Sequence, residues 1–89
     1  MRKRGLTIQQ ELACCFIQTY TKAHGFPPTV REIGAMVGFT GIRSIELALA
    51  ALEQQGYLTR TPHARRSILL TERGGVVAQR WQLAVLEVA

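Results

Sequence analysis

The chain has 89 residues, of which 47% are apolar, and a formal net charge of +5. This length fits one domain, and the apolar content excludes a disordered chain because it is sufficient to form a core. The positive charge favours a polyanionic partner, which means nucleic acid or an acidic membrane surface.

The termini and the cysteines exclude several other classes of protein. Polar residues interrupt the segment after the basic start Met1–Arg4, so it does not match a secretory signal. The apolar C-terminal stretch is too short and too polar to span a bilayer. Cys14 and Cys15, the only cysteines, are adjacent, which is not a metal-ligand spacing and indicates a reducing compartment. We therefore expect a cytoplasmic protein without membrane contact, metal, cofactor or small-molecule ligand.

Two capping boxes mark the starts of the first two predicted helices. Thr7 and Gln10 open a helix that runs to about residue 24, and Thr29 and Glu32 open a shorter one after the stiff connector Phe26–Pro28. The inner face of the second helix is predicted to consist of Ile33, Met36 and Val37, and Gly38 ends it.

A third helix is predicted from about Ile42 to Gln55, with a core face made of Ile45, Ala48, Leu49 and Leu52. Two short strands follow, at residues 57–60 and 67–70, and the polar loop 61–66 joins them into a hairpin. A turn at residues 71–75 then leads to a last helix at residues 76–88.

Three short helices followed by a basic hairpin are typical of a winged helix-turn-helix fold. We therefore predict a mainly α class with a small β-hairpin, in which an extra C-terminal helix follows three helices and the wing. Residues 1–5 are expected to be a disordered basic arm, residues 6–71 a winged-helix DNA-binding domain, and residues 72–89 a C-terminal dimerisation helix.

The most distinctive run in the sequence is Gly25-Phe26-Pro27-Pro28-Thr29-Val30-Arg31-Glu32-Ile33. Together with Leu6-Thr7 and Gln10, Gly38-Phe39, Leu49 and Leu52, and Gly56-Tyr57-Leu58, this run resembles the N-terminal DNA-binding domain of LexA-type repressors. The resemblance covers about residues 6–70 with almost no gaps. It implies a three-helix winged fold, dimeric binding to an operator and repression of transcription.

Two departures from that family change what the resemblance implies. LexA-type repressors continue into a self-cleaving serine–lysine protease domain, for which 89 residues leave no room, so we expect no proteolytic switching within this chain. The family's serine–proline start of the recognition helix is Gly41-Ile42 here, and Arg43 and Leu47 replace Asn and Glu. The operator is therefore expected to differ from that of LexA.

The predicted DNA contacts lie on the second and third helices and on the hairpin. Arg43 can read guanine through two hydrogen bonds, Ser44 can donate to a base or a phosphate, and Glu46 can accept from cytosine. Ile42 or Leu47 can touch a thymine methyl group, and the hairpin can meet phosphates or enter the minor groove. The alternative is that these residues are an ordinary solvated helix face and loop. The predicted set is Thr29, Arg31, Gly41, Ile42, Arg43, Ser44, Glu46, Leu47, Arg60, His63, Arg65 and Arg66.

The predicted C-terminal helix is apolar on more than one side, which requires more burial than one small domain surface provides. This favours a homodimer, and packing of the helix onto its own domain is the alternative. The predicted dimer contacts are Val77, Trp81, Ala84, Val85 and Val88.

The leading interpretation is a sequence-specific regulator that binds double-stranded DNA, a repressor from a phage or mobile element. The alternative is a winged-helix protein-interaction module, such as an antirepressor or a co-regulator that binds another transcription factor. We expect no enzyme, because the sequence shows no carboxylate pair, Ser–His arrangement, phosphate-binding loop or metal cluster.

Overall fold

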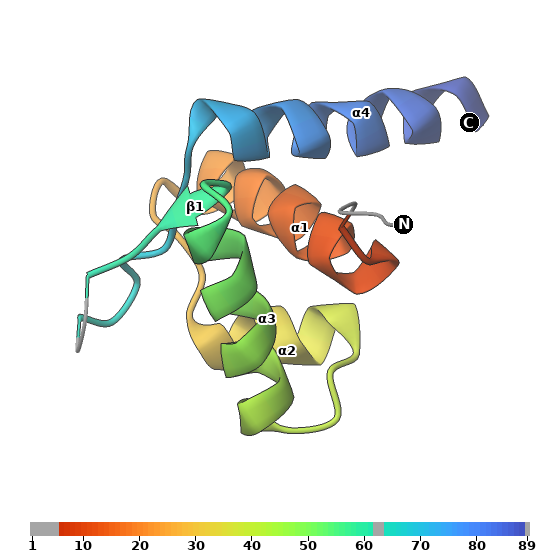
Figure 1. The fold of residues 1–89 in the computed structure, drawn as a ribbon. Coiled ribbons are helices and arrows are strands. Elements are labelled where there is room, and N and C mark those ends of the chain that lie inside the picture. Colours follow the sequence, from red (N-terminus) through yellow and green to blue (C-terminus); the bar gives the residue numbers. More distant parts are fainter. Residues whose placement is uncertain (1–5, 62–63, 89) are drawn as a thin grey trace.

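The computed structural model describes residues 6–61 and 64–88, with residues 83–88 described by their backbone alone. In chain order, its elements are α1 (Ile8–His24), α2 (Val30–Val37), α3 (Ile42–Gln54), β1 (Leu58–Thr59), β2 (Leu69–Leu70) and α4 (Glu72–Val88). The two strands are antiparallel, with Leu58 opposite Leu70. Figure 1 shows the hairpin projecting from one side of the helices. The predicted class, mainly α with a small β-hairpin, is confirmed.

The apolar faces of the helices and the hairpin meet in one core. Its buried residues are Ala13, Cys14, Ile17, Ile33, Ile45, Leu49, Leu52, Leu58, Ile68, Val77 and Ala78. In the described part of the chain, no single helix is long and apolar enough to cross a membrane. The pair formed by α2 and α3 reaches that length and composition, but the two helices are bent by 102° relative to each other.

Both predicted capping boxes are present. Gln10 donates its amide to Thr7 Oγ1 at 3.1 Å, and Thr7 donates its amide to Gln10 Oε1 at 3.0 Å. Thr29 and Glu32 make the same exchange at 3.2 and 2.8 Å. Because each box satisfies amides that have no partner within the helix, these starts are readable from four consecutive residues.

α2 and α3 approach each other closely at Gly34, where an added Cβ would collide with the side chain of Ile45. The inner face of α2 therefore centres on Ile33, Gly34 and Val37. Met36, predicted on that face, is 69% exposed. The prediction for Met36 is wrong because a pattern built on large apolar residues does not count a glycine as a packing position.

α4 begins at Glu72, within the segment predicted to be a turn. Thr71 Oγ1 accepts from the amide of Gly74 at 3.2 Å, and the Thr71 carbonyl accepts from the amide of Gly75 at 2.9 Å. A Cβ at position 74 would collide with the carbonyl of Tyr57. The glycines that suggested a turn therefore belong to the helix, where Gly74 allows close packing on the residue before β1.

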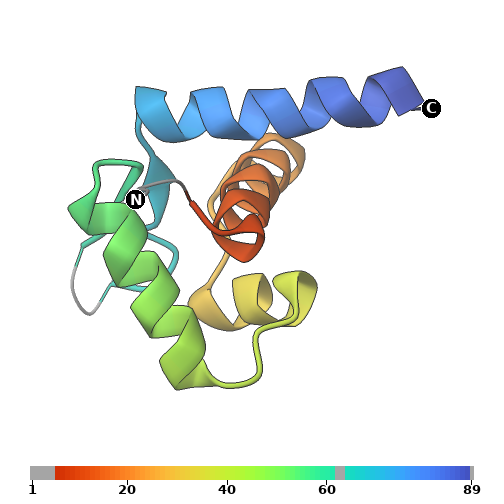
Figure 2. The same cartoon turned by 45° about the vertical axis from the view of Figure 1, so that its right-hand side comes forward.

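α4 packs against α1, as Figures 1 and 2 both show. Val77 is only 3% exposed, and the Trp81 indole donates to Glu11 Oε1 at 2.8 Å. The prediction that Val77 is a dimer contact is corrected, because its burial in the chain's own core leaves little surface for a partner. Trp81 is half-buried against the same core, so part of its surface is already covered within the chain. The end of α4 extends beyond α1 in both views, and the side chains of the other expected dimer residues, Ala84, Val85 and Val88, lie outside the described residues.

Candidate nucleic-acid interface

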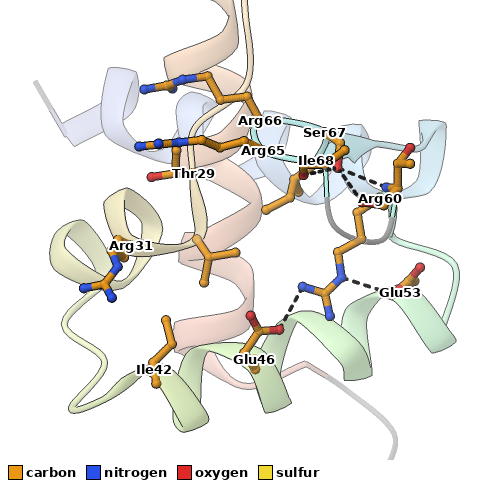
Figure 3. A pocket seen from close by; sticks show the side chains of 13 residues that line it. Thr29, Arg31, Ile42, Glu46, Glu53, Arg60, Arg65, Arg66, Ser67 and Ile68 are labelled. Atoms are coloured by element: carbon orange, nitrogen blue, oxygen red, sulfur yellow. Dashed lines mark hydrogen bonds and ion pairs between the residues drawn. The ribbon is translucent and has the colours of Figure 1, made fainter.

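A hollow of about 780 Å³ lies between the start of α2, the outer face of α3 and the hairpin (Figure 3). Three segments that are separate in the sequence therefore form one concave surface. Its wall includes two carboxylates, Glu46 and Glu53, and four arginines. Seven residues of the predicted DNA-contacting set line it: Thr29, Arg31, Ile42, Glu46, Arg60, Arg65 and Arg66.

The other predicted residues lie outside this hollow. Gly41 is the N-cap residue of α3. Arg43 is exposed and lies about 180° around the helix from the buried Leu52, given 100° per residue. Ser44 and Leu47 border a second hollow, of about 320 Å³, beside the turn between α2 and α3. His63 and the predicted arm, residues 1–5, lie outside the described residues.

Arg66 is held within the protein, although it lines the hollow. Its guanidinium donates to both oxygens of Glu32 at 3.0 and 3.1 Å, to Tyr20 Oη at 3.2 Å and to the Pro27 carbonyl at 3.1 Å. It also lies 4.8 Å from the centre of the Phe26 ring. The backbone of Arg66 has φ 54°, an uncommon conformation for a residue other than glycine. The predicted phosphate contact of Arg66 does not fit this geometry, which ties the base of the hairpin to α1 and α2.

Glu32 connects the start of α2 to the hairpin. Its carboxylate accepts the Thr29 amide of the capping box and the guanidinium of Arg66. The Thr29 amide and then Arg66 lower the pKa of Glu32 from 4.5 to about 2, so the link is charged at neutral pH. Sequence reasoning found Glu32 only as a capping residue, because 34 residues separate it from Arg66 and no local signal marks the pair.

Arg60, directly after β1, reaches across the hollow to α3, as Figure 3 shows. Its Nη1 donates to Glu46 Oε1 at 3.0 Å and its Nε to Glu53 Oε1 at 3.3 Å. The two glutamates are seven residues apart and therefore lie on one face of α3. Arg60 thus pairs with Glu46, the residue whose carboxylate was predicted from the sequence to accept a hydrogen bond from cytosine. Glu53 was not among the predicted residues, because its position is informative only when the hairpin is folded over α3.

Three arginines, Arg31, Arg43 and Arg65, are exposed and form no ion pair or side-chain hydrogen bond within the described part of the chain. Figure 3 shows Arg31 and Arg65 extending toward the same side of the hollow. A solvated guanidinium keeps its donors available to an outside acceptor such as a phosphate or a base edge. These three residues, called the outward arginines below, present positive charge beside α3 and the hollow; Lys22 on α1 and Arg80 on α4 are also exposed.

Within residues 6–61 and 64–82, whose side chains the structure describes, no group of three His, Cys, Asp or Glu side chains is close enough to hold a metal ion. Burial raises the pKa of the Cys14 thiol to about 11, so that thiol is protonated at neutral pH.

Comparison with known sequences identifies a match to the family described as the LexA DNA binding domain, over residues 3–67. The LexA repressor of Geotalea uraniireducens is 40% identical over 73 residues, which are 82% of this chain and 35% of that protein. LexA repressor 2 of Nocardia farcinica is 41% identical over 63 residues, which are 71% of this chain and 26% of that protein. The chain thus spans about a third or less of the length of these relatives.

Solved structures with the same fold have much lower sequence identity. A hypothetical protein solved at 2.2 Å resolution matches 96% of this chain and 26% of its own, with a TM-score of 0.79 and 16% identity. A mutant of S. aureus MepR matches 93% of this chain and 61% of its own, with a TM-score of 0.72 and 17% identity. SSV1 F-93 matches 98% of this chain and 96% of its own, with a TM-score of 0.63 and 14% identity. At these identities the likeness concerns the fold alone.

Proposed function

Because the chain belongs to the LexA DNA-binding domain family, we propose that it binds double-stranded DNA at preferred sequences and represses transcription. The observation that carries the proposal is the position of Arg43. It is exposed in the first turn of α3, opposite the core face of the second helix of a helix-turn-helix unit. In such units this helix enters the major groove, where its N-terminal residues reach base edges.

The roles proposed for individual residues follow from their exposure. Arg43 reads guanine, and Ile42 and Leu47, which are 50% and 61% exposed, are available for thymine methyl groups. Arg31 and Arg65 neutralise backbone phosphates beside the groove.

Four further members of the predicted set are assigned contacts in the same docking. Ser44 donates to a base or a phosphate, and His63, in the loop sequence between the strands, is kept as a proposed contact. Thr29 and Gly41 lie at the starts of α2 and α3. The capping box occupies the amides of Thr29 and Glu32, whereas no side chain caps α3, so the first amides of α3 are the ones available to a phosphate.

We also infer that the chain acts by binding and not by catalysis, since the matched family is a DNA-binding domain. This function would place the chain in the compartment that holds the DNA, in line with the cytoplasmic location expected from the sequence. A homodimer would place two α3 helices in half-sites about 34 Å apart, or a multiple of that distance. With Val77 buried in the core, the proposed contact is the end of α4, where the sequence has Ala84, Val85 and Val88.

The proposal is tested by selecting bound duplexes from a random library with the 89-residue chain. We expect a palindromic motif, because a twofold dimer reads the same half-site twice. Binding to all duplexes with equal affinity would contradict sequence-specific recognition. A single unpaired half-site, together with a monomer in sedimentation at micromolar concentration, would contradict the dimer alone.

A further inference from the structure

The ion pairs of Arg60 with Glu46 and Glu53 cross the hollow that the proposed function assigns to DNA. We infer that Arg60 is a positioning residue for sequence recognition: it orients the carboxylate of Glu46 toward a base edge and does not itself contact a phosphate. The inference rests on the proposed DNA-binding function and adds to it a determinant of specificity outside the recognition helix.

The guanidinium of Arg60 is fixed from both ends of its side chain. Its backbone directly follows β1, and the next amide, that of Thr61, donates to Ser67 Oγ at 3.0 Å. At the other end, Nε donates to Glu53 at 3.3 Å while Nη1 donates to Glu46 at 3.0 Å. The Arg60 side chain is only 22% exposed, less than either glutamate. Glu53 therefore serves as an anchor that leaves Nη1 directed at Glu46.

This contact uses one oxygen of Glu46 and leaves the other available. Oε1 accepts from Arg60, whereas Oε2 receives no hydrogen bond from the side chains and amides that the structure describes. An unrestrained glutamate that is 50% exposed samples many rotamers and loses that freedom when it binds. Because Arg60 restricts Glu46 before DNA arrives, Oε2 is preorganised to accept from the exocyclic amine of cytosine.

Charge supports the same assignment. Glu46 and Glu53 face the hollow, and two uncompensated carboxylates there would repel a polyanion. Arg60 offsets part of that charge, and a guanidinium that already holds two carboxylates has fewer donors for a phosphate. Exposed ion pairs contribute little to folding stability, so the effect of Arg60 is expected in binding and not in unfolding.

The test compares Arg60→Ala, Glu46→Ala, the double variant and Arg60→Lys on the selected duplex and on duplexes substituted at each base pair. Arg60→Ala and Glu46→Ala should lose about tenfold discrimination at the same base pair, the lower part of the range for a base contact. The double variant should lose no more discrimination than either single variant, because the two residues act as one unit. Arg60→Lys should recover part of it, since lysine keeps the charge but does not bridge both glutamates.

Arg65→Ala is the matched control, because it removes an exposed arginine from the same hollow. It should weaken all duplexes equally, make the salt dependence shallower by about one unit and preserve discrimination. If Arg60→Ala behaves like this control, Arg60 is a phosphate contact and the inference is overturned while DNA binding stands. If the unaltered chain prefers no sequence, the proposed function is overturned first, and the inference with it.

Discussion

Arg65 and Arg66 are neighbours in the chain, but the fold gives them different surroundings. Arg65 is exposed and makes no ion pair in the part of the chain that the structure describes. The guanidinium of Arg66, in contrast, is held by Glu32, Tyr20 and Phe26, a cluster called the wing base here. One arginine is therefore available to a partner, and the other holds the hairpin against the body of the domain. The number of arginines in a sequence segment therefore overestimates the positive charge available to DNA, because nearby carboxylates neutralise some of them.

The largest expected effect comes from disrupting the contact between α2 and α3, because the domain that carries both Arg65 and Arg66 depends on it. Gly34→Leu places a side chain where a Cβ already collides with Ile45, and overpacking of this kind costs about 1–3 kcal/mol of unfolding free energy. Thermal or urea unfolding measures the loss. Ala35→Leu adds the same side chain on the exposed side of α2 and should leave stability nearly unchanged; equal losses in both variants would show that the contact with Ile45 is not limiting.

The proposed base contact of one outward arginine is tested by Arg43→Ala. If Arg43 reads a guanine, its loss should cost about 1–3 kcal/mol on the preferred duplex and relax the preference at one base pair. Competition binding on substituted duplexes measures both effects. Arg31→Ala is the control and should weaken the affinity for all duplexes equally. If Arg43→Ala also weakens all duplexes equally, Arg43 contacts a phosphate and not a base.

The wing base is broken by Arg66→Ala. This change removes the partner of Glu32 and the guanidinium over the Phe26 ring, so the midpoint of thermal unfolding should fall by several degrees. Arg65→Ala should leave the midpoint close to that of the parent chain. A double Arg65→Ala and Arg66→Ala variant should make the salt slope of DNA binding shallower by about one unit and not two. A slope change of two units would place Arg66 on the DNA.

The smallest effect concerns pH. The pKa of Glu32 is lowered from 4.5 to about 2 by the Thr29 amide and Arg66, so its contribution to stability is complete above 4.5 and is lost as pH falls toward 2. Glu32→Gln does not titrate, and its stability should therefore fall less than that of the parent chain between about pH 5 and about pH 3. Glu72→Gln, which removes a carboxylate without touching Arg66, is the control. Identical pH profiles for Glu32→Gln and the parent chain would contradict the role of the carboxylate.

Sequence patterns predicted the elements best where the signal was local. The capping boxes at Thr7 and Thr29 involve residues three apart, and both appear in the structure. The start of α4 was misplaced because Gly74 and Gly75 were interpreted as turn residues, although Gly74 is needed for close packing beside Tyr57. A glycine is ambiguous in sequence, because the same missing side chain permits a turn or a close approach.

The sequence by itself determined the order of the helices, the starts of the first three, the basic hairpin and the exposed position of Arg43, because each depends on residues within one or two helical turns. Only the tertiary structure decided that Arg66 pairs with Glu32, that Arg60 bridges Glu46 and Glu53, and that α4 buries Val77 against the chain's own core. These outcomes depend on distances between segments that are far apart in the chain. An arginine that contributes to the net positive charge of the sequence is neutralised when the fold brings a carboxylate within about 3 Å of it, the range of a charged hydrogen bond.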